Sequence, residues 1–154
     1  MPEDSQIFFS APRLVKDLDR ETSHISAAFG LTFPQFMVME ALLHREQMTV
    51  GEIKDTILST KGTIPVIINN LVRLGMVRRS KDPEDGRKSL IQLTDEGRAL
   101  IERIWPVNEK MFTQRFSVWT LEEKQELLRL LSLYHKARKT GTDLQEKPHE
   151  TQNS

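Results

Sequence analysis

The sequence predicts a mainly α-helical protein with one small β-hairpin, and three observations support this prediction. Apolar residues recur at three- and four-residue spacing in several segments, which is typical of helices that bury one face. The Thr-x-x-Glu motifs at 49–52 and 120–123 are typical of helix starts. Two short strand-like segments flank a turn-like one between residues 76 and 94. At 154 residues, one domain is expected, small enough that a partner subunit could share its core.

Three helices are predicted before residue 60. Residues 7–29 form a long helix, and its expected apolar face consists of Leu14, Leu18, Ile25 and Phe29. After Gly30, Thr32 is a plausible N-cap for a second helix, which tolerates Pro34 in its first turn. Thr49 opens a third helix, with the apolar residues Ile53, Ile57 and Leu58.

The segment from Thr63 to Gly75 is predicted to be the second helix of a helix-turn-helix pair. Its apolar stripe consists of Ile64, Ile67, Ile68, Leu71 and Leu74. Asn69, Asn70 and Arg73 fall largely outside that stripe. Gly75 tolerates the left-handed conformation that closes a helix.

A basic hairpin is predicted immediately after this helix. Residues 76–81 and 90–94 read as strands, and residues 82–89 have the composition of a turn. Asp85 and Gly86 supply the backbone freedom that a hairpin tip needs, and Arg87 and Lys88 should project from the body. A protruding basic hairpin beside a helix-turn-helix pair is a wing, so this segment places one helix and one loop for contact with DNA.

Two further helices are predicted at the C-terminal end. The first starts at the Thr-Asp-Glu-Gly motif of residues 94–97 and should be kinked by Pro106, which removes one internal hydrogen bond. Thr120 opens the last helix, whose apolar residues include Leu127, Leu128, Leu130, Leu131 and Tyr134. From about residue 140 the chain is polar without apolar periodicity, and we expect it to be disordered.

Charge is distributed unevenly along a chain of zero net charge. The net charges of residues 1–60, 61–88 and 89–154 are −4, +4 and 0. Positive charge is thus concentrated in the predicted helix and wing, as expected for a surface that faces phosphates. The alternative is an ordinary solvated basic face.

Several other classes of protein fit the sequence poorly. Cysteine is absent, which excludes disulfides, thiolate metal sites and thiol-based redox sensing. The four histidines lack metal-ligand spacing, and no phosphate-binding glycine loop or nucleophile motif is present, so we expect neither an enzyme nor a cofactor. No apolar run approaches the ~20 residues of a membrane span, and the first residues are acidic, so a cytoplasmic protein without membrane contact is expected.

These residues resemble the MarR family of winged helix-turn-helix transcription regulators, over roughly residues 7–138. Residues 31–39 are similar to the Leu-Thr-x-x-Gln opening of the family's second helix, and residues 48–53 to its next helix start. Residues 71–79, 82–87 and 93–97 together look like the family's recognition-helix end, wing and post-wing helix start. In this order and spacing, the motifs are specific.

The resemblance implies a homodimeric repressor that binds a palindromic operator in double-stranded DNA. Residues 7–30 and 98–138 would form the dimerisation region, residues 31–97 the winged helix-turn-helix domain, and residues 139–154 the tail. In the wing, Arg87 would enter the minor groove while Asp85 steadies the turn. Asn69 or Asn70 can pair bidentately with adenine, and Thr60, Lys61 and Thr63 suit phosphates. The implied DNA-binding residues are Thr60, Lys61, Gly62, Thr63, Ile64, Val66, Asn69, Asn70, Arg73, Arg79, Asp85, Arg87 and Lys88.

Two positions depart from the family pattern. Pro65 stands early in the recognition helix, so either the helix starts near Gly62 or Thr63 or its first turn is distorted. Gly86 stands in the wing where a bulkier residue is common, which predicts a looser turn around Arg87.

Many regulators of this family release DNA when a small aromatic or phenolic effector binds beside the dimerisation helices. The residues expected to line such a site are His24, Phe29, Phe33, Phe36, Trp105 and Phe112. The alternative is that this aromatic stripe belongs to the core. The alternative function is a winged-helix module for protein contacts without specific DNA binding. Such a module has no need of the arginines at 78, 79 and 87 beside a recognition helix.

Overall fold

The structure is a computed structural model that describes residues 1–57 and 63–140. Four residues with predicted roles lie outside these ranges: Leu58, Thr60, Lys61 and Gly62. The tail predicted to be disordered lies outside them from residue 141 onward. The chain divides into two compact units, Met1–Phe112 and Thr113–Ser154.

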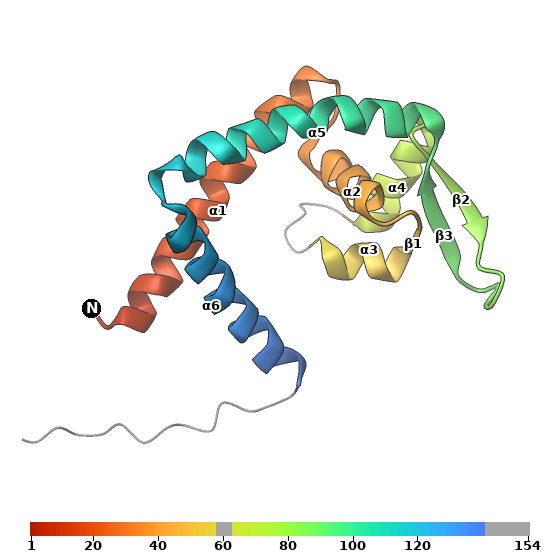
Figure 1. Ribbon diagram of the computed structural model, residues 1–154. Coiled ribbons are helices and arrows are strands. Elements are labelled where there is room, and N and C mark those ends of the chain that lie inside the picture. Colours follow the sequence, from red (N-terminus) through yellow and green to blue (C-terminus); the bar gives the residue numbers. More distant parts are fainter. Residues whose placement is uncertain (58–62, 141–154) are drawn as a thin grey trace, which may run out of the picture. The chain divides into compact units, whose positions relative to one another are not determined.

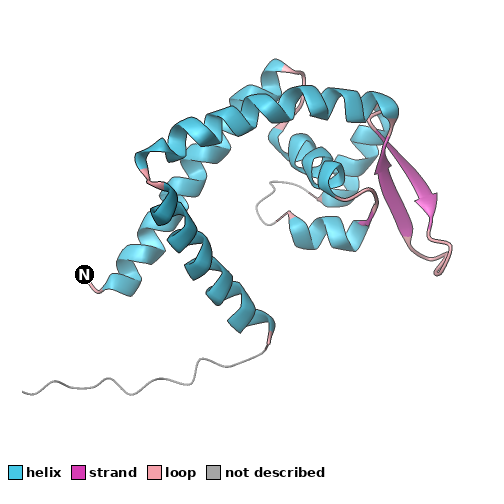
Figure 2. Ribbon diagram, viewed as in Figure 1, coloured by secondary structure: helices cyan, strands magenta, loops and turns pink. Residues whose placement is uncertain are grey.

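The first unit contains five helices and a small sheet within its described residues (Figures 1 and 2). In chain order these are α1 (Glu3–Ala28), α2 (Phe33–His44), β1 (Met48–Thr49), α3 (Val50–Thr56), α4 (Ile64–Arg73), β2 (Val77–Lys81), β3 (Ser89–Leu93) and α5 (Asp95–Arg115). The last three residues of α5 belong to the second unit, followed by a 3₁₀ turn, η1 (Phe116–Val118), and α6 (Leu121–Lys139). The predicted class, mainly α with a small β-hairpin, is confirmed.

The helix starts follow the predicted caps, with one difference. Thr32 and Thr120 each accept a backbone N–H, from Gln35 and Glu123, and each donates its own N–H to that residue's side chain. Both are complete capping boxes. At α3, Thr49 Oγ1 also accepts the Glu52 N–H, but the Glu52 carboxylate accepts from the Thr49 hydroxyl instead of its N–H. Thr49 is also the last residue of β1, where it pairs with Leu90.

Glycines in the left-handed conformation end the first and fourth helices. Gly30 has φ of 84° and Gly75 has φ of 73°. The Gly75 N–H donates to the Val72 carbonyl and the Met76 N–H to the Leu71 carbonyl, each at 3.0 Å. This pair of bonds is a Schellman motif, so the predicted closure at Gly75 is confirmed.

The sheet has three antiparallel strands in the order β1-β3-β2. The predicted hairpin corresponds to β2 and β3, each bounded within a residue of its prediction, with Val77 opposite Leu93 and Lys81 opposite Ser89. Strand β1 was not predicted, because two residues are too few to show alternation. It adds Met48 opposite Ile91 and joins the helical layer to the hairpin.

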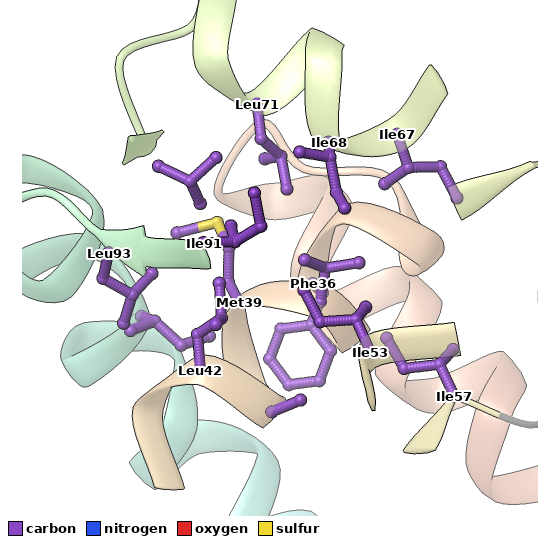
Figure 3. Close-up of a cluster of buried hydrophobic side chains, with 14 of the residues drawn as sticks. Phe36, Met39, Leu42, Ile53, Ile57, Ile67, Ile68, Leu71, Ile91 and Leu93 are labelled. Atoms are coloured by element: carbon purple, nitrogen blue, oxygen red, sulfur yellow. The ribbon is translucent and has the colours of Figure 1, made fainter. Parts of the chain in front are cut away.

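One hydrophobic core holds α2, α3, α4 and the sheet together (Figure 3). Phe36, Met39 and Leu42 of α2 lie at its centre, with α4 on one side and Ile91 and Leu93 of β3 beside them. The predicted stripe of α4 is correct except for Leu74, which is the C-cap residue and is exposed.

The expected apolar face of α1 is only partly correct. Ile25 and Phe29 pack against the core, but Leu14 is exposed. The fully buried residues of α1 are instead polar, Thr22 and Ser26. The Thr22 hydroxyl donates to Oδ1 of the buried Asn108 at 2.8 Å, which ties α1 to α5. The helix α5 continues through Pro106.

Within the described residues, no single helix is long and apolar enough to cross a membrane. The helices α1 and α2 reach that length and composition only when taken together, across a 90° bend.

Candidate nucleic-acid interface

The helix α4 presents one apolar side to the core and one polar side to solvent. It starts at Ile64 with Thr63 as N-cap, so Pro65 is the second helical residue and its missing N–H breaks no helical bond. The first alternative considered for Pro65, a start near Thr63, is therefore correct. Ile64 is only 5% exposed and lies in the core, so the structure corrects its assignment to the DNA-binding surface. Thr63, Val66, Asn69 and Arg73 are exposed.

Two arginines orient the two asparagines of α4. Arg79 on β2 donates through Nη2 to Oδ1 of Asn69 at 2.6 Å. Arg73, one turn further along α4, donates to Oδ1 of Asn70 at 2.5 Å. Because a guanidinium only donates, the atom that faces it in each pair is the amide oxygen. Both asparagines therefore keep their NH2 groups for other partners.

The neighbouring Arg78 is anchored on the other face of the hairpin. Successive strand residues point to opposite faces, so Arg78 and Arg79 diverge. Nε of Arg78 donates to Oε1 of Gln92, its cross-strand partner, at 3.1 Å. Nε2 of Gln92 in turn donates to Oε1 of Gln47 at 3.1 Å. These two hydrogen bonds hold Arg78 beside β1, whereas Arg79 contacts α4 through Asn69.

The tip of the wing is organised by two aspartates. The carboxylate of Asp85 accepts the Arg87 N–H at 3.1 Å, and its carbonyl accepts the Lys88 N–H at 3.0 Å. The carboxylate of Asp82 accepts the Glu84 N–H at 2.9 Å. Asp85 thus holds the backbone of Arg87. Gly86 is not in the left-handed region, so the expectation that the turn uses its backbone freedom is wrong.

Arg87 and Lys88 were expected to project away from the body. Both are exposed, but they do not simply point away from it. They border a groove of about 530 Å³ whose other wall is the start of α3. Glu52 and Asp55 of α3 line that wall. The returning arm of the wing therefore lies alongside α3, and its cations face both solvent and two carboxylates.

A second concave site lies between α1, α2 and α5. It is a cavity of about 250 Å³, lined by four of the six aromatic or histidine residues expected at an effector site: Phe33, Phe36, Trp105 and Phe112. His24 is exposed on α1 and does not line it. Phe29 lies instead under the guanidinium of Arg103, 5.6 Å from its ring centre. These two assignments are corrected: His24 is on the exposed side of α1, and Phe29 is the C-cap residue that follows the last residue of that helix.

Sequence reasoning missed two carboxylates in this cavity, Asp19 and Glu40. Burial raises the pKa of both above the ordinary range of such groups. For Glu40, the ion pair with His44 partly offsets the effect of burial on the pKa. The spacing offered a signal, because Asp19 follows Val15 by four residues and precedes Thr22 by three, which places it on the same helix face.

The fold and its surface define a winged helix-turn-helix protein, with α3 and α4 as the helix pair and β2–β3 as the wing. Residues 29–88 match the model of the MarR family. The winged helix-turn-helix part of the chain belongs to the MarR family of transcriptional regulators.

Relatives and solved structures agree with this assignment. An uncharacterised HTH-type transcriptional regulator of Bacillus subtilis, YkoM, is 28% identical over 119 residues, covering 77% of each chain. The HTH-type transcriptional regulator TtmR of Methylorubrum extorquens is 34% identical over 63% of this chain and 50% of its own. A mutant MarR of E. coli, crystallised with operator DNA, has a TM-score of 0.73 and 23% identity over 84% of this chain and 93% of its own. The protein is a DNA-binding transcriptional regulator.

Proposed function

We propose that the protein is a homodimeric repressor that binds a palindromic operator and releases it when a small aromatic molecule binds. The observation that carries this proposal is the surface formed by α4 and the wing, where Asn69, Arg79 and Arg87 are exposed together. Its charge suits phosphates, and its amide groups suit base edges. Repression would follow if the operator overlaps a promoter and the bound dimer blocks polymerase.

Within this proposal, the elements have different roles. The exposed side of α4 enters the major groove, where Asn69 and Val66 face bases, while Thr63 and Arg73 face phosphates. Arg87 reaches the minor groove from a wing that Asp85 holds in place. Two copies would contact half-sites about one helical turn, roughly 34 Å, apart.

Exposed apolar side chains support the homodimer. No described residue of α6 is buried, and six of its large apolar side chains are exposed: Leu121, Leu128, Leu130, Leu131, Leu133 and Tyr134. At the start of α1, Ile7, Phe8 and Phe9 are at least 54% exposed. Apolar surface of this extent is unusual on a monomer and marks an interface. We propose that α1 and α6 meet their counterparts in a second copy.

Replacing Leu131 with glutamate should weaken the dimer at least tenfold, because a charge would be buried in an apolar interface. The Leu131 side chain is 47% exposed in the single chain, so its replacement leaves the fold of that chain intact. Light scattering after size exclusion measures the mass as a function of concentration. The matched control is Gln125→Glu, on the same helix. A dimer of unchanged strength in Leu131→Glu would exclude this face of α6 from the interface.

Replacing Arg87 with alanine should weaken operator binding by about 1–3 kcal/mol and leave the dimer intact. The variant removes one minor-groove cation, while the turn hydrogen bond to Asp85 survives because it uses the Arg87 backbone N–H. Fluorescence anisotropy with a labelled operator measures the loss. Arg20→Ala, which removes an exposed arginine paired with Asp17 on α1, is the control. Equal affinities for all three proteins would remove Arg87 from the interface.

The proposal is tested by anisotropy with duplexes that tile the DNA upstream of the protein's own gene, against a scrambled duplex at two salt concentrations. Tight binding to one tile that survives higher salt, while the scrambled duplex is lost, would support a sequence-specific operator. In vitro transcription from that promoter would then test repression. Equal, salt-sensitive binding to every duplex would argue against an operator in this region. Absence of binding would favour a protein-contact module.

The effector part of the proposal rests on the cavity between α1, α2 and α5. The helix α2 borders the cavity through Phe36, and the same residue packs in the core that supports α4. A ligand that displaces α2 would therefore change the position of the recognition helix. We propose that a small aromatic or phenolic effector lowers operator affinity in this way.

A further inference from the structure

We infer that the cavity between α1, α2 and α5 selects a positively charged aromatic ligand, an arylalkylamine in its protonated form, over aromatic acids. This inference rests on the proposed function only in taking this cavity as the effector site, and it names the chemical class of the effector. Three features of the described structure lead to it: the volume and walls of the cavity, the sign of its charged groups, and the state of its two carboxylates.

The cavity suits one aromatic ring with a short side chain. Its volume is about 250 Å³, whereas an apolar cavity of about 150 Å³ already binds benzene. Phe33, Phe36, Trp105 and Phe112 supply aromatic walls. Such walls accept a ligand ring by stacking, and their faces also attract a cation.

The charged groups that line the cavity are both carboxylates. They are Asp19 from α1 and Glu40 from α2, and no lysine or arginine of the described chain lines it. An aromatic acid would therefore bring a third negative charge beside two others, without a cation to accept it. An ammonium group, in contrast, would meet two opposite charges and the faces of aromatic rings.

The two carboxylates differ in whether a protein group already pairs with them. Oε1 of Glu40 lies 3.1 Å from Nε2 of His44, and the His44 ring packs edge-on against Trp105 with ring centres 5.0 Å apart. Within the described chain, no hydrogen bond or ion pair engages the Asp19 carboxylate. Burial disfavours the charged form of each group, as the raised pKa of each shows. A bound ammonium would stabilise the ionised form, with Asp19 as its first partner and Glu40 as its second.

Three probes of similar size separate the ligand classes: 2-phenylethylamine, 2-phenylethanol and 3-phenylpropionate. Isothermal titration of the full-length protein without DNA at neutral pH measures each affinity directly. We expect the amine to bind at least tenfold more tightly than the alcohol, and the acid to bind more weakly than either. Equal or tighter binding of the acid or the alcohol would overturn the inference, as would failure of the amine to bind at millimolar concentration.

Isosteric variants test whether the carboxylates cause the preference. Asp19→Asn should weaken amine binding at least tenfold and Glu40→Gln about threefold, while alcohol binding stays within twofold. Glu102→Gln is the matched control, because Glu102 lies on α5 outside the cavity, paired with Arg98 at 3.8 Å. Unchanged amine affinity in Asp19→Asn would contradict the assignment.

The same proteins distinguish this inference from the proposed function. Operator affinity is measured by anisotropy with and without saturating amine. If the amine binds in the titration but does not change operator affinity, release by this ligand fails while the ligand class stands. If operator binding is intact and the amine does not bind, the ligand class fails while operator recognition stands.

Discussion

Replacing Gly97 with alanine is expected to lower the free energy of unfolding by about 3 kcal/mol, because an added methyl group meets backbone atoms that cannot move away. A Cβ at this position would lie 1.9 Å from the carbonyl oxygen of Met76. That oxygen accepts the Thr94 N–H at 3.0 Å. The Thr94 hydroxyl in turn donates to the Gly75 carbonyl at 2.5 Å and accepts the Gly97 N–H at 3.0 Å.

These bonds explain why the strain would not be relieved locally. They join the first turn of α5 to the Schellman turn that ends α4 and to the start of β2. Moving Met76 away from a new methyl group would lengthen the bond to Thr94 or distort the turn at Gly75. If α5 moved instead of Met76, Ile101 of α5, which is fully buried, would be displaced from the core.

Urea denaturation followed by circular dichroism measures the change in stability. The matched control is Gly86→Ala, because Gly86 has no positive φ and an added Cβ there meets no atom within 4 Å. That variant should be neutral or more stable by up to ~1 kcal/mol, since alanine restricts the unfolded chain. If Gly97→Ala is as stable as Gly86→Ala, the close contact between α5 and Met76 is wrong.

Periodicity and caps predicted most of the fold because they are local properties of the chain. The starts of α2 and α6 follow from Thr32 and Thr120, whose capping partners lie three residues away. Strand β1 could not be predicted, because its pairing with Ile91 joins residues more than forty positions apart. The exposure of Leu74 has a local cause. The helix α4 ends at Arg73, so Leu74, as the C-cap residue, no longer lies on the buried stripe.

The candidate sites were predictable in composition but not in geometry. The motif around Asp85 indicated its role in the turn, and the structure shows the hydrogen bond to the Arg87 backbone. The pairing of Arg79 with Asn69 joins a strand to a helix, which spacing alone does not reveal. Asp19 and Glu40 enter one cavity from two helices, so their proximity depends on tertiary packing.

Replacing Arg79 with alanine is expected to weaken operator binding by about 2–3 kcal/mol and also to change which base is preferred at one position. Arg79 would contribute its own charge to the proposed DNA-binding surface, and its guanidinium donates to the amide oxygen of Asn69 at 2.6 Å. Because Arg79 occupies one of the two acceptor sites of that oxygen, Asn69 presents mainly its NH2 group, which suits the acceptors of guanine or thymine. Bidentate recognition of adenine needs the oxygen and the NH2 group together.

Loss of Arg79 frees the Asn69 amide, so the preference at its contact position should shift toward adenine. Anisotropy with operators carrying each of the four bases at every position of a half-site measures this shift. Arg78→Ala is the matched control: it removes the same charge from the neighbouring residue, whose partner is Gln92 rather than Asn69. Any loss of affinity in this variant should be the same for every sequence, because Arg78 lies on the opposite face of the hairpin and does not contact Asn69. Identical base preferences in the two variants would show that Arg79 acts only through its charge, and Asn69 would then lose its place as an oriented base-reading residue.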